Sequence, residues 1–165
     1  MAGGTQPLHW AAVRQTCDLT AVDPETAATL PSIEAMTRAA VLVDSPDLSP
    51  STPASELPFG APASYWLDLR GYKPVEVAAA LGKPMLILQG GRDCQATVAD
   101  DLPGWRAGLA DCPDVTIRVY DPDNHMFFPG TGPSTQAEYV PAQHMDPAVV
   151  ADVAGWLTTV PAGIA

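Results

Sequence analysis

The chain has 165 residues, of which 47% are hydrophobic and 16% are charged, and its mass is 17.3 kDa. This length and apolar content fit one domain with a sizeable core and exclude a disordered polyelectrolyte. Asp and Glu number 19 against 8 Lys and Arg, giving a formal net charge of −11. This charge argues against nucleic-acid or anionic-membrane partners, because both are themselves negatively charged.

The sequence shows no pattern typical of a targeting signal, a transmembrane helix or a cysteine motif. Residues 1–6 have neither the basic start nor the apolar run of a signal peptide, and the chain has no apolar stretch of about 18 residues that would predict a transmembrane helix. Cys17, Cys94 and Cys112 form no CxxC pair, so neither a zinc ribbon nor a disulfide framework is expected. We predict a cytoplasmic protein with free thiols.

Residues 1–57 have helical patterns and no convincing strand. Asp23 and Pro24 supply the N-cap and first position of one helix, and Ser32 caps another. The expected helices span 7–19, 24 to about 31, and 33–43. A connection over 44–53, rich in Pro and Ser, is expected on the surface.

Residues 58–165 follow an α/β pattern. Helices are expected over 62–69, 74–81, 98–110 and from 146 onward, and strands over 83–89 and 115–120. A strand, a helix and a second strand in that order predict two adjacent parallel strands. Because a two-stranded parallel sheet leaves both edges open, the pattern reads as part of a larger α/β sheet.

Two polar side chains follow the ends of these strands. Asp93 lies just beyond the first strand, and His125 just beyond the second. Neighbouring parallel strands are about 4.8 Å apart, so the carboxylate can reach Nδ1 of the imidazole. That contact orients the ring and stabilises its protonated form, while Nε2 stays available for proton transfer.

The sequence around both residues resembles the α/β-hydrolase superfamily. The run 83–93, KPMLILQGGRD, is similar to the acid-bearing strand and turn of dienelactone-hydrolase-like and serine-peptidase-like bacterial esterases. The run 124–127, NHMF, resembles their histidine loop. The resemblance covers about residues 57–157 and implies hydrolysis of carboxylic ester or related acyl bonds by a Ser-His-Asp triad. It makes Asp93 the acid and His125 the general base, with a small-molecule ester or acyl substrate.

One part of the family pattern is missing. The sequence contains no G-x-S-x-G nucleophile motif, and Ser64 follows no predicted strand. The resemblance therefore implies a helical cap, residues 1–57, followed by the C-terminal part of a hydrolase, residues 58–165. Whether Met1 is a natural start or a truncation stays open. We expect the isolated chain to be inactive. The alternative is a non-catalytic hydrolase half that acts with a separate N-terminal half or by self-association.

Each of the other candidate residues has a functional and a purely structural interpretation. The residues expected to line a substrate pocket, or else simply to pack in the core, are Tyr65, Trp66, Met126 and Phe127. Cys94 could serve as a nucleophile but is more plausible as a packed thiol. His9 and His144 could join His125 in a metal site, but they have no helical i, i+4 spacing. No cofactor and no metal is therefore expected.

Overall fold

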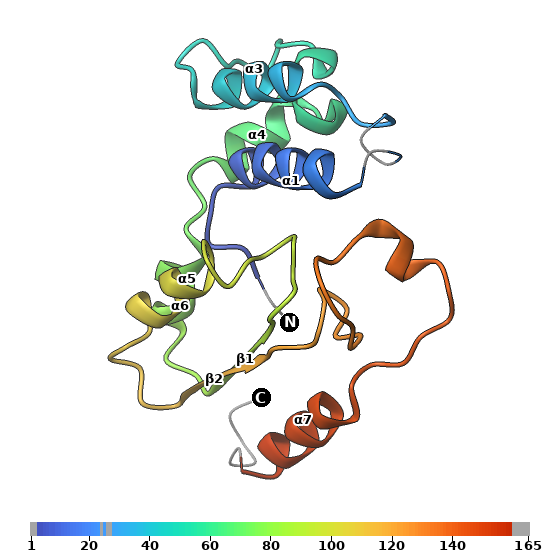
Figure 1. The fold of residues 1–165 in the computed structure, drawn as a ribbon. Helices are drawn as coiled ribbons and strands as arrows, with labels where there is room; N and C mark the ends of the chain where they lie inside the picture. Colours follow the sequence, from blue (N-terminus) through green and yellow to red (C-terminus); the bar gives the residue numbers. More distant parts are fainter. Residues whose placement is uncertain (1–2, 24, 26–27, 160–165) are drawn as a thin grey trace. The chain divides into compact units, whose positions relative to one another are not determined.

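The computed structural model describes residues 3–23, 25 and 28–159, which form two compact units (Figure 1). One is the helical segment Gln6–Lys73. The other joins residues 3–5 to residues 74–159 and contains the strands. The two compact units divide after Lys73, because helix α4 (Ala63–Leu69) packs with the N-terminal helices.

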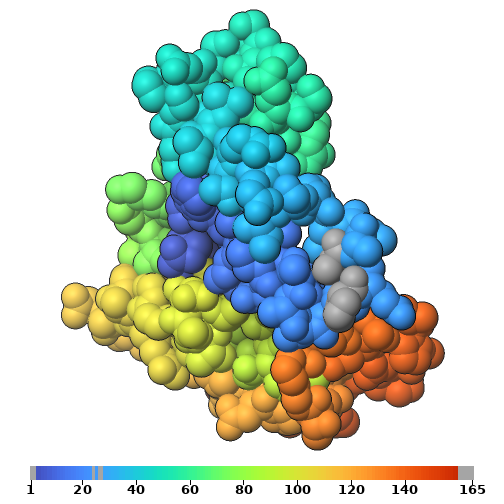
Figure 2. Space-filling model, turned by 45° about the horizontal axis from the view of Figure 1, so that its top comes forward, coloured from blue at the N-terminus to red at the C-terminus, as the bar shows by residue number. Residues whose placement is uncertain are grey.

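The N-terminal unit is built from helices and short turns. Its elements are α1 (Leu8–Val22), α3 (Ile33–Asp44), the 3₁₀ turns η1 (Ala54–Glu56) and η2 (Pro58–Gly60), and α4. Helix α1, dark blue in Figure 2, packs against α3. The Ser32 side chain accepts a hydrogen bond from the amide of Ala35 at 3.2 Å, which confirms the predicted cap of α3. Pro24, the predicted first position of another helix, lies outside the described residues.

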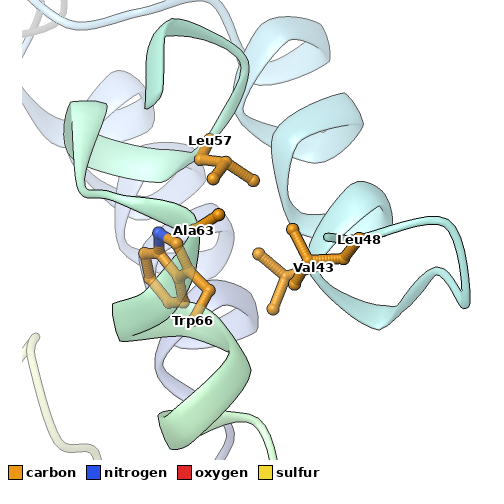
Figure 3. Close-up of a cluster of buried hydrophobic side chains, with 5 residues drawn as sticks. All are labelled: Val43, Leu48, Leu57, Ala63 and Trp66. Atoms are coloured by element: carbon orange, nitrogen blue, oxygen red, sulfur yellow. The ribbon is translucent and has the colours of Figure 1, made fainter. Parts of the chain in front are cut away.

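A cluster of buried side chains holds this unit together (Figure 3). It consists of Val43, Leu48, Leu57, Ala63 and Trp66. Leu48 comes from the proline-rich connection, which forms turns rather than helix or strand, as predicted. Burying one such aliphatic side chain contributes about 1.5–3 kcal/mol. The connection is therefore anchored to the core although most of it lies on the surface.

The second unit contains a parallel pair of strands. Its elements are α5 (Pro74–Leu81), β1 (Met85–Gly90), α6 (Leu102–Gly108), β2 (Val115–Tyr120), η3 (Gln136–Tyr139) and α7 (Pro147–Thr159). The strands pair in register from Met85 opposite Val115 to Gly90 opposite Tyr120, which confirms the predicted parallel arrangement. Helix α6 begins later than expected, because the side chain of Asp101 accepts the amide of Thr97 at 2.8 Å in a preceding turn.

Helices cover both faces of β1. Ile87 packs with Ala78 of α5 and with Leu109, which follows α6, whereas its neighbour Leu88 packs with Val149 of α7. Successive side chains of a strand point to opposite faces, so the described part of this unit is a three-layer α/β fragment. On α7 the predicted apolar stripe is only partly buried, since Val150 and Leu157 are exposed.

Residues 3–5 are fixed to the beginning of α6. The amide of Thr5 donates to Oδ1 of Asp101 at 2.7 Å, and Nε1 of Trp105 donates to the carbonyl of Gly3 at 2.7 Å. Gly104 leaves room for this contact, because a Cβ there would lie 2.8 Å from Oγ1 of Thr5. Both connections to the helical unit therefore start from the α/β unit.

No helix in the described part of the chain is long and apolar enough to cross a bilayer.

Candidate active site

Two glycines bring the loops that follow β1 and β2 into contact. A Cβ on Gly90 would lie 2.4 Å from the carbonyl oxygen of Asn124, and one on Gly91 would lie 2.5 Å from Cα of Asp121. Atoms other than hydrogen do not fit at such distances. The glycine pair is therefore needed for the close approach of two backbones, which places residues 90–93 beside residues 121–125.

Asp93 and His125 meet in this contact. Nδ1 of His125 lies 2.9 Å from Oδ2 of Asp93. The other carboxylate oxygen, Oδ1, accepts hydrogen bonds from the amides of Gln95 at 2.8 Å and Ala96 at 3.0 Å. The Asp93 side chain is completely buried, whereas that of His125 is 28% exposed. The acid is thus held rigidly, and the imidazole keeps access to solvent.

The pair also sets the protonation of the ring. The hydrogen bond to Asp93 raises the pKa of His125, although burial opposes the shift. An ionised carboxylate only accepts hydrogen bonds, so the proton between the two groups belongs to Nδ1. Nε2 is then the nitrogen that can take up a proton in a reaction.

Asn124 shapes the turn that carries His125. This residue is completely buried, and its Oδ1 accepts hydrogen bonds from the amides of Met126 at 3.0 Å and Phe128 at 3.1 Å. The turn includes Phe127 in the left-handed region, with φ at 58°. Such a conformation costs a bulky residue about 1–3 kcal/mol. The two bonds to Asn124 help to hold it.

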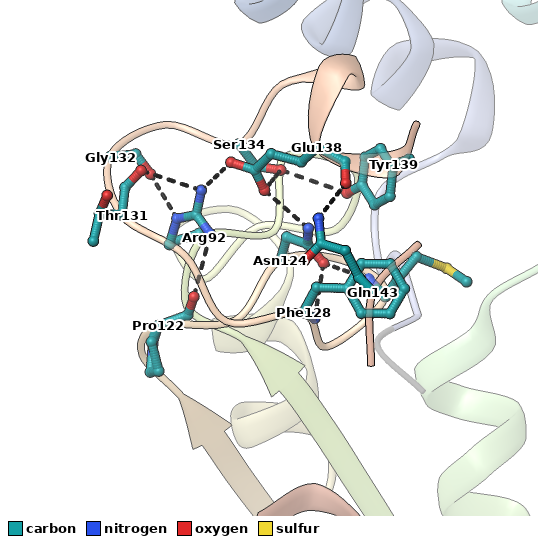
Figure 4. Close-up of polar contacts among 11 residues, drawn as sticks. Arg92, Pro122, Asn124, Phe128, Thr131, Gly132, Ser134, Glu138, Tyr139 and Gln143 are labelled. Atoms are coloured by element: carbon teal, nitrogen blue, oxygen red, sulfur yellow. Dashed lines mark hydrogen bonds and ion pairs between the residues drawn. The ribbon is translucent and has the colours of Figure 1, made fainter. Parts of the chain in front are cut away.

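An ion pair supports Asn124 from the long segment that follows (Figure 4). Nδ2 of Asn124 donates to Oε2 of Glu138 at 2.9 Å, and Oε1 of Glu138 forms an ion pair with Arg92. Burial raises the pKa of Glu138, but the bonds from Asn124 and Arg92 outweigh it and lower the pKa overall. Sequence reasoning missed both Glu138 and Arg92, since they lie 46 positions apart and no local motif links them.

The residues predicted to line a substrate pocket occupy different environments. Trp66 is completely buried in the core of the N-terminal unit, while Tyr65 on the same helix is exposed. Met126, next to His125, is 51% exposed, and Phe127 packs with Leu88 and Val149 in the core of the α/β unit. Contact with substrate stays a prediction for all four.

The two other histidines considered for a metal site, His9 and His144, lie in different environments. His9 is buried, and its Nε2 lies 2.9 Å from Oδ1 of Asp44 within the N-terminal unit. His144 is exposed. Among residues 3–23, 25 and 28–159, no group of three or more His, Cys, Asp or Glu side chains is placed to hold a metal ion.

Two cavities are lined by residues in the ranges 31–60 and 79–115 of the described part of the chain. One, of about 520 Å³, is lined by residues of α3 and of the η1–η2 segment, including Met36, Leu42 and Phe59. The other, of about 320 Å³, lies at the amino-terminal ends of the strands beside Met85 and Val115. Neither of these two cavities is lined by Asp93 or His125.

Comparison with known proteins points to the esterases. Over 105 residues the chain is 40% identical to Esterase EstD of Thermotoga maritima, a stretch that makes up 64% of this chain and 25% of the esterase. The chain thus spans about a quarter of the length of this relative. No family model matches the chain, and no solved structure matches it significantly. The identity supports a relationship to ester-hydrolysing enzymes.

Proposed function

We propose that this chain supplies the acid and the general base of a serine-esterase site of the α/β-hydrolase type. The observation that carries the proposal is the contact of 2.9 Å between the buried Asp93 and Nδ1 of the half-buried His125, at the carboxyl ends of adjacent parallel strands. Ligands of open α/β sheets bind beyond these strand ends. The identity to a Thermotoga esterase supports the same reaction class.

In the proposed reaction the nucleophile comes from outside the residues of this chain, which contain no G-x-S-x-G motif. Its serine hydroxyl attacks the ester carbonyl while Nε2 of His125 takes the hydroxyl proton. The same proton passes to the departing alcohol, which leaves an acyl-enzyme. Water then attacks the acyl group by the same route, releasing the carboxylic acid and the serine. Asp93 accepts the hydrogen bond from Nδ1 and so holds the imidazolium.

The helical unit Gln6–Lys73 is proposed as a cap of this site. Both of its connections start from the α/β unit, because residues 3–5 are bound to α6 and the chain returns at Pro74. The exposed side chains of Tyr65 and Met126 are proposed to contact a small ester or acyl substrate. None of the three cysteines forms a disulfide, which is in keeping with a proposed cytoplasmic setting.

A chimera tests the proposal. Residues 74–159 of this chain would replace the corresponding segment of the Thermotoga esterase, and hydrolysis of p-nitrophenyl acetate would be measured. We expect an active chimera, in which Asp93→Asn and His125→Ala each lower kcat by about 10³- to 10⁴-fold. The matched changes Asp114→Asn and His144→Ala, at exposed positions, should leave kcat within about twofold. A chimera whose activity survives both Asp93→Asn and His125→Ala would disprove these roles.

A second candidate function is a non-catalytic one, in which the chain is completed by another polypeptide that supplies the rest of a hydrolase sheet. The exposed apolar side chains Val150 and Leu157 on α7 favour it. Sedimentation of the chain at increasing concentration distinguishes this candidate, since a compact monomer that binds no apolar dye would count against it. Val150→Glu with Leu157→Glu should abolish any association.

A further inference from the structure

Both oxygens of the Glu138 carboxylate have partners, which come from three parts of the α/β unit. Its Oε1 is paired with Arg92, and its Oε2 accepts from Nδ2 of Asn124 at 2.9 Å and from Oγ of Ser134 at 3.3 Å. Arg92 itself is 10% exposed and also donates to the carbonyls of Gly132, Pro122 and Thr131. Figure 4 shows these contacts converging on one carboxylate. The Glu138 side chain is 24% exposed, and a carboxylate with this many donors is ionised and fixed in place.

This carboxylate determines which way the Asn124 amide faces. The two ends of an amide differ, because the oxygen accepts hydrogen bonds and the nitrogen donates them. Glu138 only accepts, so Nδ2 must point toward it. Oδ1 then necessarily faces the amides of Met126 and Phe128 on either side of the turn. Glu138 therefore selects the orientation in which Asn124 can hold the turn.

The turn in question carries His125 on the residue directly after Asn124. Two backbone bonds, from the amide of Asn124 to the carbonyl of Phe128 at 3.1 Å and from the amide of Phe127 to the carbonyl of Asn124 at 2.9 Å, close the turn that contains His125. The short helix η3 contacts the histidine turn through Glu138, whose Oε2 accepts from Nδ2 of Asn124.

We propose that Glu138 is a positioning residue for His125, acting through Asn124 to keep Nδ1 of the imidazole against Asp93. The effect of Glu138 on catalysis rests on the proposed function, whereas its effect on the position of His125 does not. Loss of the carboxylate leaves the buried amide of Asn124 without an acceptor and frees Asn124 to rotate. The turn then relaxes, and Nδ1 loses its fixed distance to the acid.

The test uses the full chain of 165 residues and follows His125 by NMR. In the unaltered chain we expect a low-field signal from the Nδ1 proton shared with Asp93. In Glu138→Ala this signal should disappear, and the pKa of His125 should fall toward its usual value. Ser134→Ala is the matched control, because it disturbs the same segment and removes a donor to Glu138 but leaves the Asn124 contact. It should lower stability slightly and preserve the signal.

The NMR signal and the titration of His125 in the Glu138 variants either support or overturn the positioning role. A folded Glu138→Ala chain with an unchanged Nδ1 signal and unchanged His125 titration would overturn the proposal. If that variant does not fold, Glu138→Gln is read in its place. Glutamine replaces one carboxylate oxygen by an NH₂ group, which cannot accept from Asn124 or Arg92, so the signal should weaken. In the chimera described above, Glu138→Ala should lower kcat about 10²-fold with little change in KM. An inactive chimera would refute the esterase function without affecting the NMR result.

Discussion

The Cα of Gly90 and the carbonyl oxygen of Asn124 approach so closely that no side chain fits between them. A Cβ on Gly90 would lie 2.4 Å from that oxygen and 2.7 Å from the carbonyl oxygen of Asp123. Both obstacles are backbone atoms, which cannot move aside as a flexible side chain would. The contact is what allows an acid on one loop and an imidazole on the other to share a proton.

Gly90→Ala should therefore lower the free energy of unfolding by more than about 2 kcal/mol, because the added methyl group forces the two loops apart. Urea unfolding followed by circular dichroism measures the change. Gly155→Ala is the matched control: apart from its chain neighbours and the backbone of α7, nothing lies within 4 Å of a Cβ at this position, and alanine should raise helix stability by about 0.5–1 kcal/mol. Equal effects of the two substitutions would contradict the close-contact argument.

Asp93→Asn should lower the pKa of His125, because it removes the charged acceptor that raises this pKa. NMR titration of the ring reports the change, and Asp114→Asn at an exposed position serves as its control. The shift also affects stability. Since folding raises the pKa of His125, the stabilisation by Asp93 is complete below pH 6.5 and is lost as pH rises through the folded-state pKa. The variant should lack this loss. A His125 pKa unmoved by the substitution would show that the pair is not coupled in solution.

Asp123→Asn is expected to stabilise the chain at neutral pH. Asp123 is completely buried, and neither of its carboxyl oxygens has a hydrogen-bond partner. Burial raises its pKa, the charge of Asp146 adds to the effect, and Arg92 opposes it. Because the folded-state pKa is raised, the neutral carboxyl is favourable below pH 3.8, and this advantage is lost as pH rises through the folded-state value.

The neutral amide should raise the free energy of unfolding at pH 7 by about 1 kcal/mol. Thermal unfolding between pH 4 and pH 8 measures the effect, which should grow with pH over the lower part of that range. Asp121→Asn, two residues earlier and exposed, should change stability by less than about 0.5 kcal/mol. A destabilised Asp123→Asn chain would mean that the carboxylate has a partner in solution.

A fluorophosphonate probe should label no residue of the 165-residue chain. Covalent reaction needs a nucleophile activated by His125 and a set of amides that stabilise the oxyanion, and the sequence contains no G-x-S-x-G motif. Intact-mass spectrometry detects an adduct, with a serine esterase of known activity as the positive control. An adduct on Cys94 or Ser64 would identify an active nucleophile within this chain and refute the expected inactivity.

Local patterns were sufficient to predict most elements of the fold. The alternation Val-Thr-Ile-Arg-Val-Tyr gave β2 its observed bounds, Val115–Tyr120, because period two is the signature of a strand. Ser32 marked the beginning of α3 through its side-chain cap. Helix α1 continues to Val22, beyond its predicted end, with Oγ1 of Thr20 bonded to the carbonyl of Thr16 at 2.7 Å. Helix ends depend on such side-chain bonds, which periodicity does not reveal.

In the candidate site, too, some residues could be predicted from the sequence and others could not. Asp93 and His125 were expected to be neighbours because each follows a strand, and the structure places them 2.9 Å apart. Glu138 could not be predicted, since its contact with Arg92 depends on the path of an irregular segment between residues 129 and 145. The packing of Trp66 against Val43 could not be predicted either, because it is a tertiary contact without a sequence signature.

The anchoring of residues 3–5 on α6 affects the entropic cost of closing the segment between residues 5 and 74 into a loop. Because the bonds from Thr5 to Asp101 and from Trp105 to Gly3 hold one end of the helical unit's connections, and Pro74 begins the other, the whole unit is a closed loop on a folded base. The entropy of closing such a loop grows only with the logarithm of its length, by about 0.6 kcal/mol per doubling. On this ground we expect the α/β unit to accept inserted segments of different length between residues 5 and 74 at a similar entropic cost of loop closure.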